Sequence, residues 1–309
     1  MKKLAFVLTL FVFQFHLVSG QSETKIPTLN GHPFTGLGTM KSPYTNTSFF
    51  LELGLGETGV FTTEGVPVGD STVFNLNGEL LFVNLRFGYK QRVKKWISFF
   101  FNADYSARLG NSAESIYVSG VNTMITIEPG VSFSILEKEK FVLSGYVKLT
   151  NTESSIVDVS GFVEDLFAGK KYASLTRDVP ALNGGGGLTG IYAIGPSIAF
   201  HVDGQLVYGE TLERTPPELQ YYIGSNVSLN FQKWLNLPIT FTTGGYANTL
   251  TNVFSTQGNL TSSFLMKLTY TGSESFALSI ESYNGRTPIE NTNNRVQLRG
   301  VSFSSRFYF

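Results

Sequence analysis

The chain has 309 residues, with 23 basic and 23 acidic side chains and no cysteine. Balanced charge argues against a nucleic-acid partner, and zero cysteine excludes disulfides, thiolate metal sites and thiol catalysis. Charged residues make up only 15% of the chain, against roughly 25% in soluble domains, while aromatic residues reach 14%. This mixture suits a protein whose strands turn one face to lipid and keep the other face polar.

The first 20 residues have the pattern of a secretory signal peptide. Lys2 and Lys3 precede a mostly apolar run over residues 4–17, and the small residues at 18–20 offer a cleavage site. A retained membrane anchor is the alternative, although the apolar run is shorter than the roughly 20 residues that a spanning helix needs. The next segment, 21–46, contains three prolines and no strand pattern, so it is treated as a separate unit.

From residue 47 onward, apolar and polar side chains alternate with a period of two, which predicts strands with one apolar face. Twelve such segments follow one another: 47–56, 81–90, 97–106, 125–135, 141–149, 188–202, 205–212, 219–231, 239–248, 260–270, 276–283 and 295–309. Pro129, Pro196 and Gly300 fall inside these segments, so we expect bulges there, or a last strand that rises above the bilayer before Gly300.

The connections between these segments alternate in length. The short ones are 91–95, 137–140, 203–204, 232–237 and 271–275, with Asp203-Gly204 predicting a two-residue hairpin turn. The long ones are 57–78, 109–122, 150–187, 213–218, 249–259 and 284–294. Segment 150–187 carries enough apolar residues to predict a short helix, which either folds over the mouth or into the lumen, or packs on neighbouring loops.

The chain ends on a strand with a terminal aromatic residue. Its apolar face carries Val301, Phe303, Phe307 and Phe309. In these features the chain resembles the outer-membrane β-barrels of Gram-negative bacteria, and the small residues followed by Gln21 resemble exported proteins of the Bacteroidota. The resemblance implies that these four residues are the signal read by the barrel-assembly machinery, and that outer-membrane lipid surrounds the barrel.

The resulting fold prediction is all-β: a transmembrane, up-and-down antiparallel β-barrel of 12 strands over residues 47–309, with 10 or 14 strands as alternatives. Residues 150–187 form its long outer loop, and 21–46 form a periplasmic tail or a plug in the lower barrel. Both termini are expected in the periplasm, because short turns on that side and long outer loops are typical of such barrels. A soluble two-sheet sandwich is a further alternative.

If the apolar side chains face lipid, the side chains of opposite parity line the interior. The charged residues expected there are Glu52, Arg86, Lys90, Asp104, Glu128, Lys148, Lys267, Glu281 and Arg306. One interpretation is a structural network of salt bridges that neutralises itself. The other is a narrow polar pore, whose slight basic excess would favour anionic or hydroxylated solutes.

The functional prediction is a narrow, porin-like channel for small polar solutes. The alternative is a closed barrel that serves as a scaffold or accessory subunit of an envelope protein complex. Catalysis is not expected. Outer-membrane phospholipases and proteases need a histidine beside a serine or aspartate near the outer leaflet or the exterior, and only His32 and His201 follow the signal segment. His32 lies in the N-terminal segment, and His201 lies at the periplasmic end of its predicted strand. No cofactor and no metal site are expected, since histidines are few and carboxylates are scattered.

Overall fold

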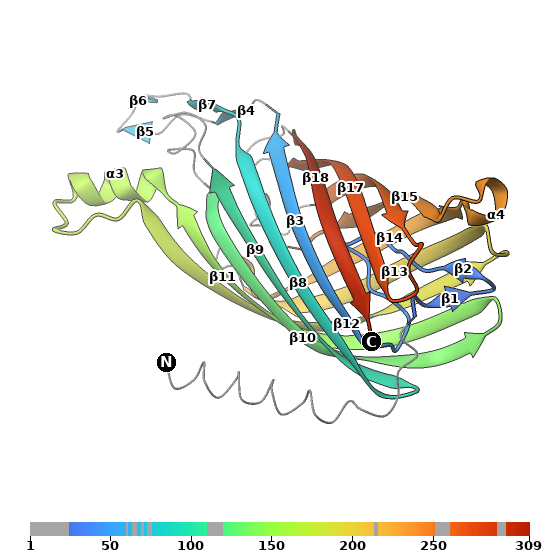
Figure 1. Ribbon diagram of the computed structural model, residues 1–309. Coiled ribbons are helices and arrows are strands. Elements are labelled where there is room, and N and C mark those ends of the chain that lie inside the picture. The colour runs from blue at the N-terminus through green and yellow to red at the C-terminus, as the bar shows by residue number, and fades with distance from the viewer. Residues whose placement is uncertain are drawn as a thin grey trace.

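The computed structural model describes residues 25–59, 61–63, 67–68, 71–72, 76–109, 120–212, 216–250, 260–288 and 295–309. The expected signal peptide, residues 1–20, lies outside this part of the chain. Within it, twelve antiparallel strands close into a single barrel (Figure 1). The predicted twelve-stranded, all-β barrel is therefore confirmed, and the two-sheet sandwich is wrong.

The barrel strands follow one another around the wall in sequence order, which is the up-and-down arrangement. Their bounds are β3 (Ser48–Thr58), β8 (Leu81–Lys94), β9 (Ile97–Leu109), β10 (Gly120–Lys138), β11 (Phe141–Val157), β12 (Thr176–Ala193), β13 (Ile198–Gly209), β14 (Glu218–Asn230), β15 (Ile239–Asn248), β16 (Thr261–Tyr270), β17 (Phe276–Pro288) and β18 (Arg295–Tyr308). The last strand closes the barrel by pairing with β3, as expected, with Ser302 opposite Gly54. Closure leaves no unpaired strand edge in the wall.

The outer face of the wall is an apolar belt. Its exposed side chains include Leu51, Leu53, Leu55, Leu85, Phe99, Ile125, Val147, Leu149, Leu188, Phe200, Val202, Leu206, Ile223, Phe264, Met266, Leu268, Ile280 and Phe303. An apolar surface that encircles the molecule far exceeds the patches of a few hundred Å² found on soluble monomers. Lipid is the solvent that this face fits.

Smaller elements decorate the two ends of the barrel. Strands β1 (Thr28–Leu29) and β2 (His32–Pro33) form a hairpin at the end with the short turns, where helix α4 (Gln232–Leu235) also lies (Figure 1). At the other end, β4 (Phe61–Thr63) pairs with β7 (Leu76–Gly78), and β5 (Pro67–Val68) pairs with β6 (Ser71–Thr72). In the described residues, no helix is long and apolar enough to cross a membrane.

The predicted hairpin turn at Asp203-Gly204 is wrong. Strand β12 begins at Thr176 and ends at Ala193, and the turn lies over residues 194–197, where Pro196 lacks an N–H to give to a ladder. Asp203 instead lies within β13, opposite Thr189 on one side and Gly224 on the other. The glycines at 184–187 suggested a loop, but they pair with both β11 and β13, so their backbone is fully used by the sheet.

The long outer loop is consequently shorter than expected. Strand β11 continues to Val157, and helix α3 (Val159–Phe167) occupies the connection to β12. The helix forms as predicted from the apolar residues, but it extends away from the barrel axis instead of covering the mouth (Figure 1). Phe167 at its end is 76% exposed.

The expected bulges at Pro129 and Gly300 are absent. Pro129 faces Phe101 with the register of β9 and β10 unbroken, and Gly300 pairs with Tyr283 in an unbroken register between β17 and β18. A Cβ at Gly300 would lie 2.3 Å from the Tyr283 ring, so the glycine provides space for this ring along the inner wall. Register shifts occur instead between Val121 and Thr123 and between Ser134 and Leu136 of β10.

Candidate functional site: the lumen and its N-terminal plug

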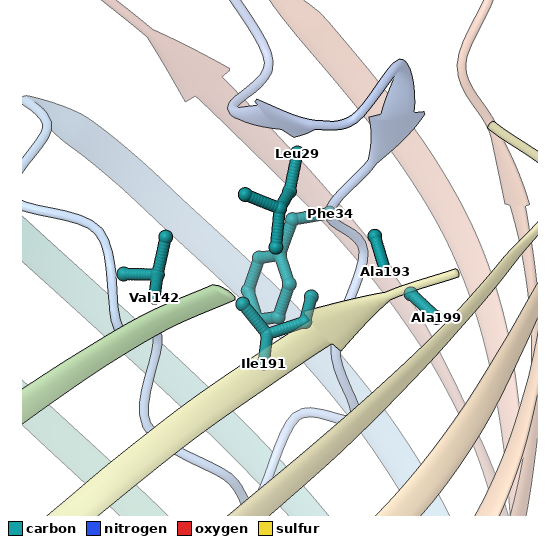
Figure 2. Packing of buried hydrophobic residues seen from close by; sticks show 6 residues of the cluster. All are labelled: Leu29, Phe34, Val142, Ile191, Ala193 and Ala199. Carbon is teal, nitrogen blue, oxygen red and sulfur yellow. The ribbon is translucent and has the colours of Figure 1, made fainter. Parts of the chain in front are cut away.

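Residues 25–46, called the N-terminal plug below, run inside the barrel and begin with the β1–β2 hairpin. Its turn, Asn30-Gly31, has positive φ angles of 50° and 77°. Such turns favour Asn-Gly because both central residues need a left-handed backbone. The hairpin and the residue after it insert Leu29 and Phe34 among Val142, Ile191, Ala193 and Ala199 of β11, β12 and β13 (Figure 2).

Polar side chains attach this hairpin to the turn between β12 and β13. The Asn30 amide donates to the carbonyl oxygens of Ala193 and Ile194, at 3.3 and 3.2 Å. The Nδ1 of His32 lies 3.2 Å from the Pro196 carbonyl and its Nε2 lies 3.1 Å from the Ser228 hydroxyl. A carbonyl only accepts, so Nδ1 carries the proton. Burial lowers the pKa of His32 to about 4, which keeps the ring neutral.

The plug reaches furthest into the lumen at residues 36–41. The Gly38 N–H donates to Glu281 at 3.1 Å, and the Gly38 carbonyl accepts from Arg86 at 3.1 Å. Lys267 donates to the carbonyl of Gly36 at 2.9 Å. A Cβ on Gly38 would lie 2.9 Å from a Glu52 oxygen, so the backbone approaches the charged wall closely only because this residue is glycine.

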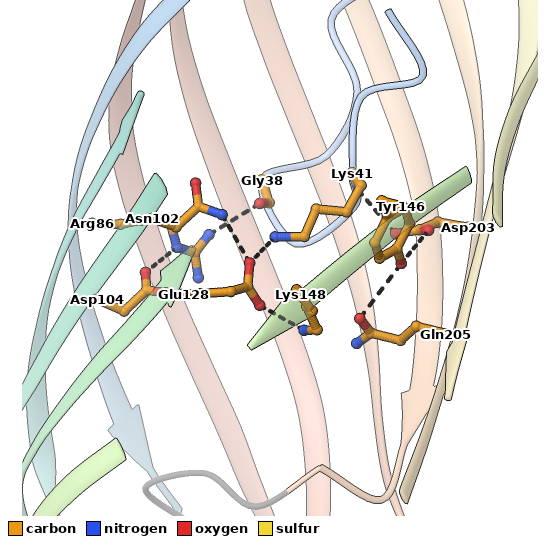
Figure 3. Close-up of polar contacts among 10 residues, drawn as sticks. All are labelled: Gly38, Lys41, Arg86, Asn102, Asp104, Glu128, Tyr146, Lys148, Asp203 and Gln205. Carbon is orange, nitrogen blue, oxygen red and sulfur yellow. Dashed lines mark hydrogen bonds and ion pairs between the residues drawn. The ribbon is translucent and has the colours of Figure 1, made fainter. Parts of the chain in front are cut away.

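Lys41 is held to the wall through three groups. Its N–H donates to Asp203 at 2.9 Å, and its carbonyl accepts from the Thr189 hydroxyl at 2.8 Å. Its ammonium pairs with Glu128, which also pairs with Lys148 at 2.5 Å (Figure 3). One carboxylate therefore binds two lysines, one from the plug and one from β11. This arrangement links the position of the plug to the charge balance of the wall.

After Lys41 the chain returns toward the end from which it entered. The Ser42 carbonyl accepts from Lys90 at 3.2 Å, and the Pro43 carbonyl accepts from the Ser144 hydroxyl. Thr45 donates to the carbonyl of Lys95, in the turn between β8 and β9, at 2.6 Å. The plug then continues into β3. Entry and exit of the plug thus lie at the same, short-turn end of the barrel.

Beside the plug, the lumen holds a cavity of about 430 Å³. Gly38 to Ser42 line it, together with residues from most of the barrel strands. Its lining extends from Ser48 and Lys90 near the short-turn end to Leu250 and Leu298 toward the long-loop end. The plug therefore occupies part of the lumen's cross-section along this cavity.

All nine charged residues predicted to line the lumen point inward, and most of them are paired. Arg86 lies between Asp104, at 2.5 Å, and Glu52, at 3.6 Å. Glu128 binds Lys148, and Lys267 lies 3.9 Å from Glu281. In the described part of the chain, Lys90 and Arg306 form no ion pair. The structure therefore brings seven of the nine into compact pairs and leaves two cations facing the cavity.

Sequence reasoning missed several lumen residues that contact the plug. Thr189 and Asp203 stand opposite each other in β12 and β13, and Lys41, far away in the chain, meets both of them only through the path of the plug. A local signal was present in Asn30-Gly31, a dipeptide that favours a hairpin, and it could have identified β1 and β2. Asp203 could have been predicted to line the lumen only if the turn had been predicted at Pro196 instead of at Asp203-Gly204.

His201 lies beneath the plug and contacts neighbours of the wall. Its Nε2 is 2.9 Å from the Thr189 hydroxyl and its Nδ1 is 3.1 Å from the Asn226 amide. The ring also meets Phe34 edge-on. Among the residues that the structure describes, no three His, Asp or Glu side chains gather as metal ligands would. His201 therefore serves the packing between the plug and the wall.

No protein-family model matches the chain, and no curated protein matches it in sequence. Solved structures with a similar backbone include the translocator domain of the autotransporter NalP from Neisseria meningitidis, at 9% identity and a TM-score of 0.47 over 86% of this chain and 90% of that one. The P. putida toluene transporter TodX has 10% identity and a TM-score of 0.43, over 85% and 90% of the two chains. The KdgM porin has 9% identity and a TM-score of 0.40, over 85% and 99%.

These proteins are outer-membrane β-barrels. At such low identities and TM-scores the likeness carries no argument about substrate or mechanism. The closed wall and the apolar belt show independently that the chain forms a β-barrel whose outer face suits lipid. The chain has the fold of an outer-membrane β-barrel. What it does must be argued from the plug and the cavity.

Proposed function

We propose that the protein is a gated channel that lets small polar solutes cross the outer membrane through a narrow lumen. The observation that carries the proposal is the cavity of about 430 Å³, which is lined in part by plug residues 38–42. Solutes would enter this cavity from the long-loop end and leave at the short-turn end only when the plug moves. Hydroxyl, amide and charged groups of the wall would replace part of a solute's hydration shell.

The path of the plug supports movement as the gating step. Because the plug enters and leaves at the same end of the barrel, it can withdraw without threading chain through the lumen. Its deeper part is attached by hydrogen bonds and ion pairs, such as those of Gly38 and Lys41, which water can replace when the segment leaves. Leu37 and Met40 also pack there against Tyr222 and Leu265, and withdrawal would expose this apolar contact. The proposed channel could therefore open without a change in the barrel wall.

A lock between the plug and the wall tests the proposal. The hydroxyls of Thr35 and Thr242 are 3.4 Å apart, so a Thr35→Cys, Thr242→Cys pair should form a disulfide in a chain with no other cysteine. The matched control is Thr126→Cys, Thr152→Cys, which joins two wall strands whose hydroxyls are 3.2 Å apart. In planar bilayers we expect openings from the wild type and the control. The oxidised lock should show none until it is reduced.

A closed scaffold is the second candidate, and the extensive pairing of inward charges favours it. Deleting residues 25–45 discriminates between the two. A channel should then conduct continuously, whereas a barrel that is plugged by its wall should stay closed. Absence of openings in both the wild type and the deletion variant would overturn the channel proposal and leave the scaffold, which co-purification in mild detergent would then examine.

We further propose that the short-turn end, with the plug and both chain ends, faces the periplasm. The cysteine-free chain allows a direct test by labelling whole cells with an impermeant maleimide. Phe167→Cys in the exposed end of α3 should react on intact cells, while Glu139→Cys in the turn between β10 and β11 should react only after lysis. The opposite pattern would reverse the orientation.

A further inference from the structure

Two cations of the cavity lack carboxylate partners. Lys90 on β8 and Arg306 on β18 both line the cavity, and neither forms an ion pair with any residue that the structure describes. Their neighbours behave differently, since Arg86, Lys148, Lys267 and Lys41 each pair with a carboxylate. Among the cations that line the cavity, those without an ion pair to a described residue are thus Lys90 and Arg306.

The two cations lie on either side of β3. In the sheet, Ser48 of β3 stands opposite Lys90 on one side and opposite Tyr308 on the other. Arg306 stands opposite Phe50, two positions along β3. Lys90 is close enough to Arg306 and to Lys41 to be repelled by both. Like charges that are held together away from bulk water favour the binding of an anion between them.

Aromatic rings border the same place. The guanidinium of Arg306 lies 4.8 Å from the centre of the Phe50 ring, and the ammonium of Lys41 lies 5.1 Å from the centre of the Phe100 ring. Phe50 and Phe100 both contribute to the cavity lining. Within the described part of the chain, the Lys90 ammonium donates to the Ser42 carbonyl at 3.2 Å, a neutral acceptor of the plug. An incoming carboxylate would be a stronger acceptor for this ammonium.

We propose that this corner of the cavity is a binding site for a small organic carboxylate with an apolar or aromatic body. Lys90 and Arg306 would bind the carboxylate, and the Phe50 and Phe100 rings would contact the body. A cavity of about 430 Å³ has room for a molecule of that size. The site identifies the class of solute that the channel proposed above would carry. Only this role in transport rests on the proposed function, whereas the binding itself does not.

The site also adjoins the plug, because Lys90 holds Ser42. A bound carboxylate would compete with the Ser42 carbonyl for the Lys90 ammonium. Occupation of the site would then remove one of the contacts that hold the plug near its exit. Ligand binding and plug release are expected to favour each other for this reason.

Equilibrium binding of benzoate to the purified full-length barrel in detergent tests the site, with benzamide as the neutral probe of the same shape and inorganic phosphate as an anion without an apolar body. We expect saturable binding of benzoate, and binding of benzamide and phosphate at least tenfold weaker. Equal binding of benzoate and benzamide would overturn the role of the cations. Equal binding of phosphate and benzoate would overturn the role of the rings.

Variants locate the site. Lys90→Met and Arg306→Met keep an unbranched, flexible side chain but remove its charge, and each should weaken benzoate binding at least tenfold. Arg306→Lys should retain most of the binding, and Arg177→Met, beyond the cavity in β12, should leave it unchanged. Folding of each variant is checked by heat-dependent electrophoretic mobility. Unchanged affinity in both methionine variants would exclude this site.

The outcome of the binding experiment does not depend on whether the barrel conducts in a bilayer. A barrel that binds benzoate through Lys90 and Arg306 but never opens in a bilayer would contradict the channel and retain the binding site. The opposite result is a barrel that conducts but binds benzoate no more tightly than benzamide, with equal benzoate affinity in the wild type and the variants. That result would contradict the binding site and retain the channel.

Discussion

The two halves of the lumen share one wall but differ in what occupies them. In the half near the short turns, the N-terminal plug packs Leu29 and Phe34 against the wall and places Lys41 among wall carboxylates. A cavity of about 430 Å³ remains beside the plug and continues toward the long loops, where Leu250 and Leu298 line it. The difference between the two halves shows that an added segment, and not the wall alone, fills the short-turn half of the lumen.

The contacts of the plug also differ along its length. Near the entrance they combine apolar packing with the polar anchors of Asn30 and His32. Deeper in the lumen, charged side chains of the wall meet the backbone of residues 36–41, and Leu37 and Met40 pack against the wall. Changes at the two places should therefore have different sizes and different dependence on pH.

The largest effect is expected where plug and wall share one carboxylate. Glu128→Gln leaves the buried Lys148 without its charged partner and releases Lys41 at the same time. Breaking one side of a buried pair typically destabilises a protein by about 3–5 kcal/mol. Urea unfolding in lipid vesicles measures the loss. The exposed pair of Asp165 and Lys170 on the α3 loop is the control, and Asp165→Asn should change stability by less than about 1 kcal/mol. Equal losses would contradict the shared-carboxylate role of Glu128.

The second largest effect is a dependence of plug docking on pH. It is expected from His32, in the half of the lumen that the plug fills. The pKa of His32 in the docked plug is about 4, below its ordinary value of 6.5, so the docked state binds fewer protons than the released state. Docking is thus strongest above pH 6.5 and weakens as pH falls toward 4, by at most about 3 kcal/mol. Channel openings in bilayers should become more frequent at pH 5 than at pH 7. His32→Gln cannot titrate and should abolish the difference. A difference that persists in this variant would assign it to another group.

The smallest effect is expected at Gly38, where the plug meets the cavity. Gly38→Val must displace the flexible ends of Glu52 and Arg86, since even a Cβ would lie 2.9 and 3.3 Å from them. Because these side chains can shift, we expect docking to weaken by only about 1 kcal/mol. Opening frequency in bilayers should rise several-fold. Gly204→Ala is the control, since its Cβ would meet nothing within 4 Å, and it should behave as the wild type. An unchanged opening frequency in Gly38→Val would show that the plug is not sensitive at this point.

Most of the wall could be predicted from local sequence. The alternation of apolar and polar residues predicted the number of strands and located ten of them, whereas the predicted segment 188–202 spans the end of β12, the turn at 194–197 and the start of β13. The pairing of β18 with β3 followed from the expectation of a closed barrel. The error at Asp203-Gly204 shows the limit of local signals. That dipeptide favours a hairpin in isolation, but long pairing with β12 and β14 keeps it within a strand, and the chain turns at Pro196 instead.

The sequence by itself determined the wall and the direction of its side chains, because the period of two is a property of each strand alone and a lipid-facing surface tolerates few charges. Only the tertiary structure decided how the lumen is filled. Lys41 meets Asp203, and Arg86 meets Gly38, through contacts between distant parts of the chain for which neither partner carries a local pattern. The same long-range pairing decided that Lys90 and Arg306 are the inward charges left to meet a ligand.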